Sequence, residues 1–214
     1  MESVPVKFIM AIISQFEQES MREASKLSSL WGDFVEDLLL NQKEYELALV
    51  PIKRSDDSEE LYYYMCPRNN GLNPVLFENL NVAAHYVKIW HVCLYEEMPS
   101  SLNFTLASPS VIPLIKEVLV NNFLPINFTS CLPATACGPL LNILSYLPPM
   151  KKIIINSEAT LVEQVWQRNL AQNCFKEILF QQPPSKVDVA LLEENGFNRK
   201  SDYPMQMSAR FERK

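Results

Sequence analysis

The chain has 214 residues, of which 48% are hydrophobic and 21% are charged, a composition typical of a folded globular protein and unlike a disordered tail. Its length fits either one large domain or a small module followed by a medium-sized one. The formal net charge of −6 and the scattered lysines and arginines argue against the clustered basic face that nucleic-acid binding requires, so we expect no nucleic-acid partner.

The five cysteines are widely spaced and include no Cys-x-x-Cys pair, so the sequence indicates neither a disulfide framework nor a zinc motif. The N-terminal apolar segment lacks the basic start and the small-residue cleavage site of a signal peptide, and no run of about 18 apolar residues occurs. We therefore expect no membrane contact and a cytoplasmic protein, with the nucleus as a second compartment.

The first predicted element is a helix that starts at Pro5, where a proline in the first turn loses no hydrogen bond. Its apolar stripe consists of Phe8, Ile9, Ile12, Ile13 and Phe16. After a polar break, the helical spacing of apolar residues resumes over 21–31 and continues over 33–40. A unit this short cannot bury so wide a stripe within itself, so either the following domain or a second protein must cover it.

Two segments rich in strand-forming residues follow at 45–52 and 60–66, and the charged turn between them predicts an antiparallel hairpin. A third strand is expected over 87–95, with Val87, Ile89, His91, Cys93 and Tyr95 on one face. Aromatic side chains on a strand surface are typical binding anchors, so Trp90 and His91 are the candidate contacts for a client protein. A buried Trp90 in the sheet core is the alternative.

From there a repeat is visible, because four short extended segments are centred on Phe104, Phe128, Ile153 and Ile178, with separations of 24, 25 and 25 residues. Each is followed by a segment with helical spacing, and Ser185 to Asp188 has the pattern of a capping box. A strand and helix repeated at this period predict a leucine-rich-repeat-like solenoid with parallel strands. An open doubly wound sheet is the alternative.

The N-terminal segment resembles an F-box, and the register of the match carries the resemblance. Val4-Pro5 stands in the place of the family's Leu-Pro, and the distance from Pro5 to Trp31 is that of the family pattern without a gap. The other matching positions are Ile12, Ile13, Ser14, Phe16, Met21, Ala24, Ser25 and Leu27. With the predicted repeats behind it, the chain resembles nematode-type F-box proteins with a leucine-rich-like C-terminal domain.

The resemblance implies that residues 1–42 bind a Skp-type adaptor, and through it a cullin, in a ubiquitin ligase. The implied adaptor-binding residues are Val4, Pro5, Phe8, Ile12, Ile13, Phe16, Met21, Leu27, Leu30 and Trp31. The predicted fold is thus α/β, with a helical F-box at 1–42 and, at 43–214, a hairpin followed by a leucine-rich-repeat-like solenoid that binds a client protein. Such a substrate receptor has no catalytic residues and no cofactor.

Other chemistry has little support in the sequence. The four glycines form no phosphate-binding loop. His91 and Cys93 could supply two metal ligands, but no second pair lies near them in the sequence, so we predict no metal site. Two alternatives to the ligase subunit stay open, namely an interaction protein that never meets a ligase and a small cysteine-dependent enzyme.

Overall fold

The computed structural model describes residues 12, 18–27, 30–68, 73–80, 86–122, 125–131, 138–156, 165, 167–201 and 207–213. The strands in this part of the chain are β1 (Lys43–Lys53), β2 (Glu59–Pro67), β3 (Val87–Leu94), β4 (Thr105–Leu106), β5 (Ile126–Ser130), β6 (Met150–Ile155), β7 (Glu177–Phe180), β8 (Phe197–Lys200) and β9 (Ala209–Arg213). The helices are α2 (Gln18–Ala24), α3 (Leu30–Asn41), α4 (Val111–Val120), α5 (Gly138–Leu144), α7 (Lys186–Glu194) and the 3-10 turn η1 (Phe77–Asn79).

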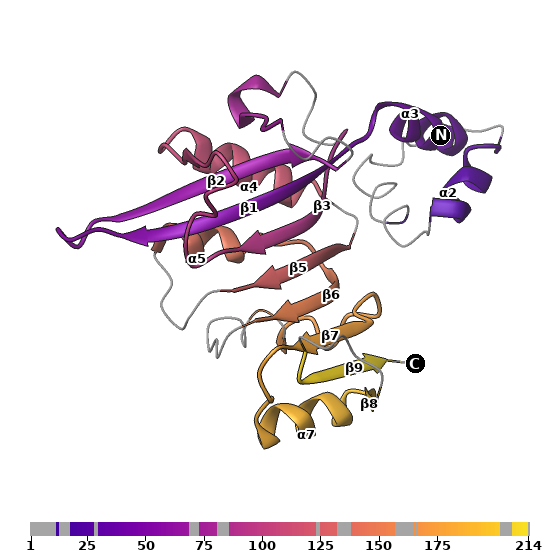
Figure 1. Cartoon of the computed structure of the whole chain (residues 1–214). Coiled ribbons are helices and arrows are strands. Elements are labelled where there is room, and N and C mark those ends of the chain that lie inside the picture. Colours follow the sequence, from indigo (N-terminus) through magenta and orange to yellow (C-terminus); the bar gives the residue numbers. More distant parts are fainter. Residues whose placement is uncertain are drawn as a thin grey trace.

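The strands form one mixed sheet of nine strands in the order β4-β2-β1-β3-β5-β6-β7-β9-β8 (Figure 1). The pairs from β1 through β3, β5 and β6 to β7 are parallel, whereas β2, β4, β8 and β9 all pair antiparallel with their neighbours. The predicted hairpin is present, with Tyr45 opposite Pro67 and Lys53 opposite Glu59. The two edges of the sheet are the two-residue strand β4 and the strand β8, which carries Arg199 and Lys200.

The predicted fold, a helical F-box followed by a leucine-rich-repeat-like solenoid, is wrong. The described residues form a single mixed sheet with only five α-helices, and strands dominate. The repeat fails at its first unit, because the segment around Phe104 leads into β4, which pairs antiparallel with β2. The Phe104 ring packs against Tyr64 and Tyr95, with ring centroids 5.8 and 6.4 Å apart, and this contact holds the segment beside β2. The strand next to β5 is β3 instead.

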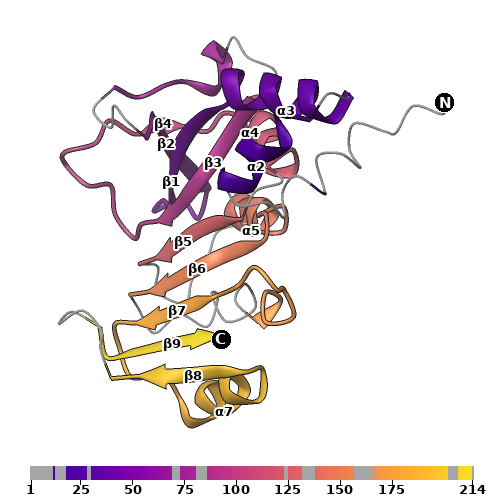
Figure 2. The same cartoon turned by 90° about the vertical axis from the view of Figure 1, so that its right-hand side faces the viewer.

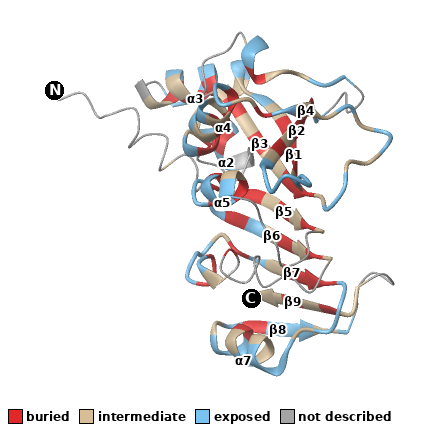
Figure 3. Cartoon of the chain, turned by 90° about the vertical axis from the view of Figure 1, so that its left-hand side faces the viewer, coloured by how far each residue is buried: buried red, intermediate tan, exposed pale blue. Residues whose placement is uncertain are grey.

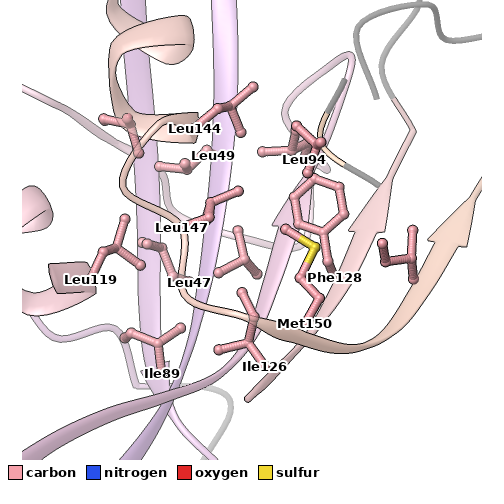
Figure 4. Close-up of a cluster of buried hydrophobic side chains, with 14 of the residues drawn as sticks. Leu47, Leu49, Ile89, Leu94, Leu119, Ile126, Phe128, Leu144, Leu147 and Met150 are labelled. Atoms are coloured by element: carbon pink, nitrogen blue, oxygen red, sulfur yellow. The ribbon is translucent and has the colours of Figure 1, made fainter. Parts of the chain in front are cut away.

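The main core lies on one face of the sheet, which is covered by α4 and α5 (Figure 2). Leu47, Ile89 and Phe128 from three neighbouring strands are fully buried there, and Leu119 of α4 and Leu144 of α5 pack over them (Figure 4). At about 25 cal/mol per Å² of apolar surface removed from water, this layer is the largest favourable contribution to folding. The strands hold most of the buried residues, while α7 is largely accessible (Figure 3).

The helix α7 and the turn that follows it form where local sequence patterns predict them. The Ser185 hydroxyl accepts a hydrogen bond from the Asp188 backbone N–H, and the Asp188 carboxylate accepts one from the Ser185 N–H, so the predicted capping box at the start of α7 is confirmed. The turn from α7 into β8 passes through Gly196, whose φ of 81° is the left-handed conformation that favours glycine.

We call the other face of the sheet the open face. A β-bulge in β3 determines which side chains of this strand lie on it. Tyr45 pairs with Ile89 and Glu46 with His91, so Trp90 is the extra residue. The bulge shifts the alternation, and Val87 and Ile89 therefore share the core face with Val92 and Leu94, while His91 and Cys93 lie on the open face. The predicted grouping of Val87 and Ile89 with His91 is wrong for this reason.

Candidate functional site

The predicted adaptor-binding residues fall partly within the described part of the chain. Outside it lie Val4, Pro5, Phe8, Ile13 and Phe16. Ile12 is helical and half-buried, and Leu30 is the first residue of α3.

Helices α2 and α3 form a small apolar cluster of their own, which we call the head cluster. Its buried members are Met21, Val35 and Leu38, and the half-buried residues packed against them are Ala24, Trp31, Phe34, Leu39 and Tyr86. Met21 and Trp31 thus share one cluster, but they lie on two helices and not on the single helical segment that the spacing over 21–31 predicts. Leu27 lies outside the cluster, with 57% of its side chain exposed. The helices lie beyond the end of the sheet at which β1 and β3 begin, away from the core under α4 and α5 (Figure 1).

Close approach of backbone atoms fixes the connection between α2 and α3. Gly32 is buried in the first turn of α3, and a Cβ atom at this position would lie 1.8 Å from the Leu27 carbonyl oxygen. The head is joined to the sheet by Tyr86, which directly precedes β3 and donates a hydrogen bond to the Asp37 carboxylate of α3. The head cluster is thus a distinct packing unit held at one end of the sheet.

The second predicted surface, around Trp90 and His91, lies at the centre of the sheet. Both side chains are half-buried, and their rings are 5.1 Å apart at an angle of 46°. The Arg68 guanidinium lies 4.8 Å from the centre of the indole ring, a cation–π contact. Among the described residues the shielded Trp90 Nε1 has no hydrogen-bond partner. Client binding by this pair stays a prediction.

Charged side chains on neighbouring strands form ion pairs on the open face. Glu44 accepts from both Arg68 and Lys88 at 2.6 Å, and Lys152 lies 2.7 Å from Glu177. Burial opposes ionisation of Glu44, but the hydrogen bonds from Lys88 and Arg68 outweigh it and hold the pKa of this carboxyl below its usual range. These charges of the open face are therefore paired with one another.

Between these ion pairs lies a cluster of Glu46 from β1 and His91 and Cys93 from β3. His91 Nδ1 is 3.6 Å from Glu46 Oε2. Cys93 Sγ is 3.7 Å from Glu46 Oε1, 3.7 Å from His91 Nδ1 and 3.3 Å from His91 Nε2. The other ring nitrogen, Nε2, lies 2.9 Å from Thr129 Oγ1 of β5. The three groups are of the types that ligate metal ions, and their ligand atoms all lie within 4.8 Å of one another.

Sequence reasoning missed Glu46, although the alternation of β1 puts this residue on the face opposite Tyr45 and Leu47. The missing information was the pairing of β1 with β3, which joins residues 46 and 91. Parallel neighbours far apart in a chain carry no local signal.

Three of the described thiols, those of Cys66, Cys93 and Cys174, are poor nucleophiles at neutral pH. Burial raises the pKa of the Cys66, Cys93 and Cys174 thiols, and the Glu46 carboxylate raises the first two further. Because the thiolate is the reactive form, we expect iodoacetamide at pH 7 to modify these three more slowly than it modifies a free cysteine peptide. Peptide mapping of the native protein measures the rates. Rapid modification of Cys93 would contradict the buried environment and support the cysteine-enzyme alternative.

The described helices include none that is both long and apolar enough to cross a lipid bilayer. Comparison with known proteins gives no further assignment: no family model, no curated protein sequence and no solved structure matches the chain.

Proposed function

We propose that the chain is a non-catalytic recognition subunit of a Skp-cullin-F-box type ubiquitin ligase. Its N-terminal segment binds a Skp-type adaptor, and through it a cullin, while the sheet domain binds a client protein in the cytoplasm. Its contribution to ubiquitin transfer is proximity, because a client held beside the transfer machinery has a high effective concentration.

The observation that carries the proposal is the separation of the head cluster from the main core. Met21, Val35 and Leu38 bury one another and do not join the core beneath α4 and α5. Leu27, an expected adaptor contact, keeps 57% of its side chain accessible in the connection that follows α2. A helical unit with its own packing and an exposed leucine can bind a partner without disturbing the sheet.

A protein-interaction role outside any ligase is the second candidate, and the accessible leucine favours it equally. The two candidates differ in the partner, so adaptor binding separates them. The cysteine-dependent enzyme has less support, because the raised pKa of three thiols disfavours the thiolate that such an enzyme needs.

The test is co-purification of the full chain with a Skp-type adaptor expressed in the same cells. Replacing Leu27 by aspartate places a charge where an apolar contact is expected. Burial of a leucine side chain is worth about 1.5–3 kcal/mol, which corresponds to binding that is roughly 10–100-fold weaker in the variant. Isothermal titration with purified adaptor gives the two dissociation constants.

Val187→Asp is the matched control, because Val187 is 74% exposed on α7, far from the head. It makes the same change of an exposed apolar residue to aspartate and is expected to bind the adaptor as the wild type does. A wild-type chain that does not bind the adaptor would refute the ligase role. Equal weakening by both variants would refute the assignment of Leu27 to the interface.

A further inference from the structure

The cluster of Glu46, His91 and Cys93 has the donor atoms and the spacing of a tetrahedral metal site. With zinc bonds of about 2.3 Å to sulfur and about 2.0–2.2 Å to nitrogen and oxygen, tetrahedral ligands lie roughly 3.4–3.6 Å apart. Here Nδ1 lies 3.6 Å from Oε2, whereas Sγ lies 3.7 Å from the other carboxylate oxygen, Oε1, and 3.7 and 3.3 Å from Nδ1 and Nε2. One ligand atom from each residue lies within 4.8 Å of the other two, so rotation of these side chains can bring all three to one ion.

The outer contacts also match those of a metal site. A histidine ligand usually uses its second ring nitrogen for a hydrogen bond that fixes the ring. His91 has this arrangement, because Nδ1 faces the Glu46 carboxylate while Nε2 lies 2.9 Å from Thr129 Oγ1. This outer partner is in place before any ion binds.

The cluster is buried at Cys93 and accessible to solvent at Glu46 and His91. Cys93 is 95% buried against an apolar wall that includes Ala48, Tyr64 and Phe104. The side chains of Glu46 and His91 keep 31% and 18% of their surface accessible, so an ion can enter from that side. A thiol, an imidazole and a carboxylate together suit a borderline-soft divalent ion, whereas Mg²⁺ and Ca²⁺ prefer oxygen ligands alone.

We propose that Glu46, His91 and Cys93 bind a single Zn²⁺ ion, with the fourth coordination position open on the accessible side of the cluster. On binding, the S–H bond of Cys93 breaks, a sulfur–zinc bond forms and the proton passes to the solvent; no oxidation is involved. The site is independent of adaptor binding, because it lies on the open face of the sheet and shares no residue with the head cluster.

The experiment is a titration of the metal-free full chain with Co²⁺, whose bond to a thiolate gives a charge-transfer absorption band. We expect one Co²⁺ per chain, displaced by one equivalent of Zn²⁺. Cys93→Ser should abolish the band, and Glu46→Gln should lower the affinity. Thr129→Val removes only the outer partner of His91 and should weaken binding about 10–100-fold. Elemental analysis after dialysis gives the stoichiometry independently.

Cys174→Ser is the matched control, since Cys174 is half-buried beside the Met150 carbonyl and lies outside the cluster. It should keep the band and the affinity of the wild type. Far-UV circular dichroism of every variant shows whether it is folded, and Thr129→Val serves as the test if Cys93→Ser does not fold. A wild-type chain that binds no Co²⁺, or a band that persists in folded Cys93→Ser, would overturn the proposal.

Discussion

Replacing Phe128 by alanine is expected to destabilise the protein by about 3–5 kcal/mol, the usual cost of deleting a buried phenylalanine side chain. Phe128 is fully buried in β5, between β3 and β6, and its ring lies close to Leu94 and Met150 (Figure 4). Neighbouring strands are fixed by backbone hydrogen bonds, so they cannot move together to fill the cavity. The loss is a large part of the roughly 5–15 kcal/mol by which folded proteins are stable.

Thermal and urea unfolding measure this effect. For a chain of this length, each kcal/mol lowers Tm by about 2–4 °C. The control is Tyr146→Ala, which also removes an aromatic ring, but one that is 41% exposed and whose centre lies 5.2 Å from the Lys116 ammonium in a cation–π pair. That variant should lose about 0.5–1 kcal/mol. Equal melting temperatures for the two variants would show that the Phe128 ring is not packed in the core.

Replacing Gly32 by alanine is expected to displace the segment that joins α2 to α3 and so to loosen the contact between the two helices. The added Cβ would lie 1.8 Å from the Leu27 carbonyl oxygen and 3.3 Å from the Ser25 carbonyl oxygen, and backbone atoms cannot rotate away as a side chain can. Overpacking of one group costs about 1–3 kcal/mol where the surroundings can adjust, and here the adjustment is loss of the contact between the helices. The sheet should stay folded, because its core is a different cluster.

Amide hydrogen exchange separates these two outcomes. In Gly32→Ala we expect faster exchange over α2 and α3 and unchanged exchange over β5 and β6. Gly138→Ala, at the start of α5, is the matched control, because the nearest atom to its added Cβ is the flexible Glu59 carboxylate at 3.3 Å. Unchanged protection of α2 in the Gly32 variant would mean that the two helices are not packed as described.

Local patterns in the sequence predict several elements but not how the strands are ordered. The hairpin of β1 and β2 follows from two strand-forming segments around a charged turn, and the capping box at Ser185 marks the start of α7. The order of the strands depends on contacts between distant residues. The 25-residue spacing indicates that strands and helices alternate. It carries no information about which strands pair, here β4 with β2 and β3 with β5.

The same limit applies to the candidate sites. Helical spacing predicted one helical segment over 21–31, whereas Met21 lies on α2 and Trp31 on α3, and the two side chains meet only because these helices pack together. The sequence could not show that Glu46 lies beside His91 and Cys93, because this proximity depends on the parallel pairing of β1 with β3 and on the bulge at Trp90. Without that extra residue, His91 would point into the core and no polar cluster would form on the open face.

The two edges of the sheet affect whether copies of this protein associate edge to edge at high concentration. An unpaired edge strand offers backbone groups to other chains, and natural proteins protect such edges by keeping them short or charged. Here β4 has two residues, and β8 carries the exposed Arg199 beside Lys200. A second copy would form few backbone hydrogen bonds with β4, and its own β8 would be repelled by the positive charges of β8. The sheet therefore resists growing into fibrils, despite its nine strands.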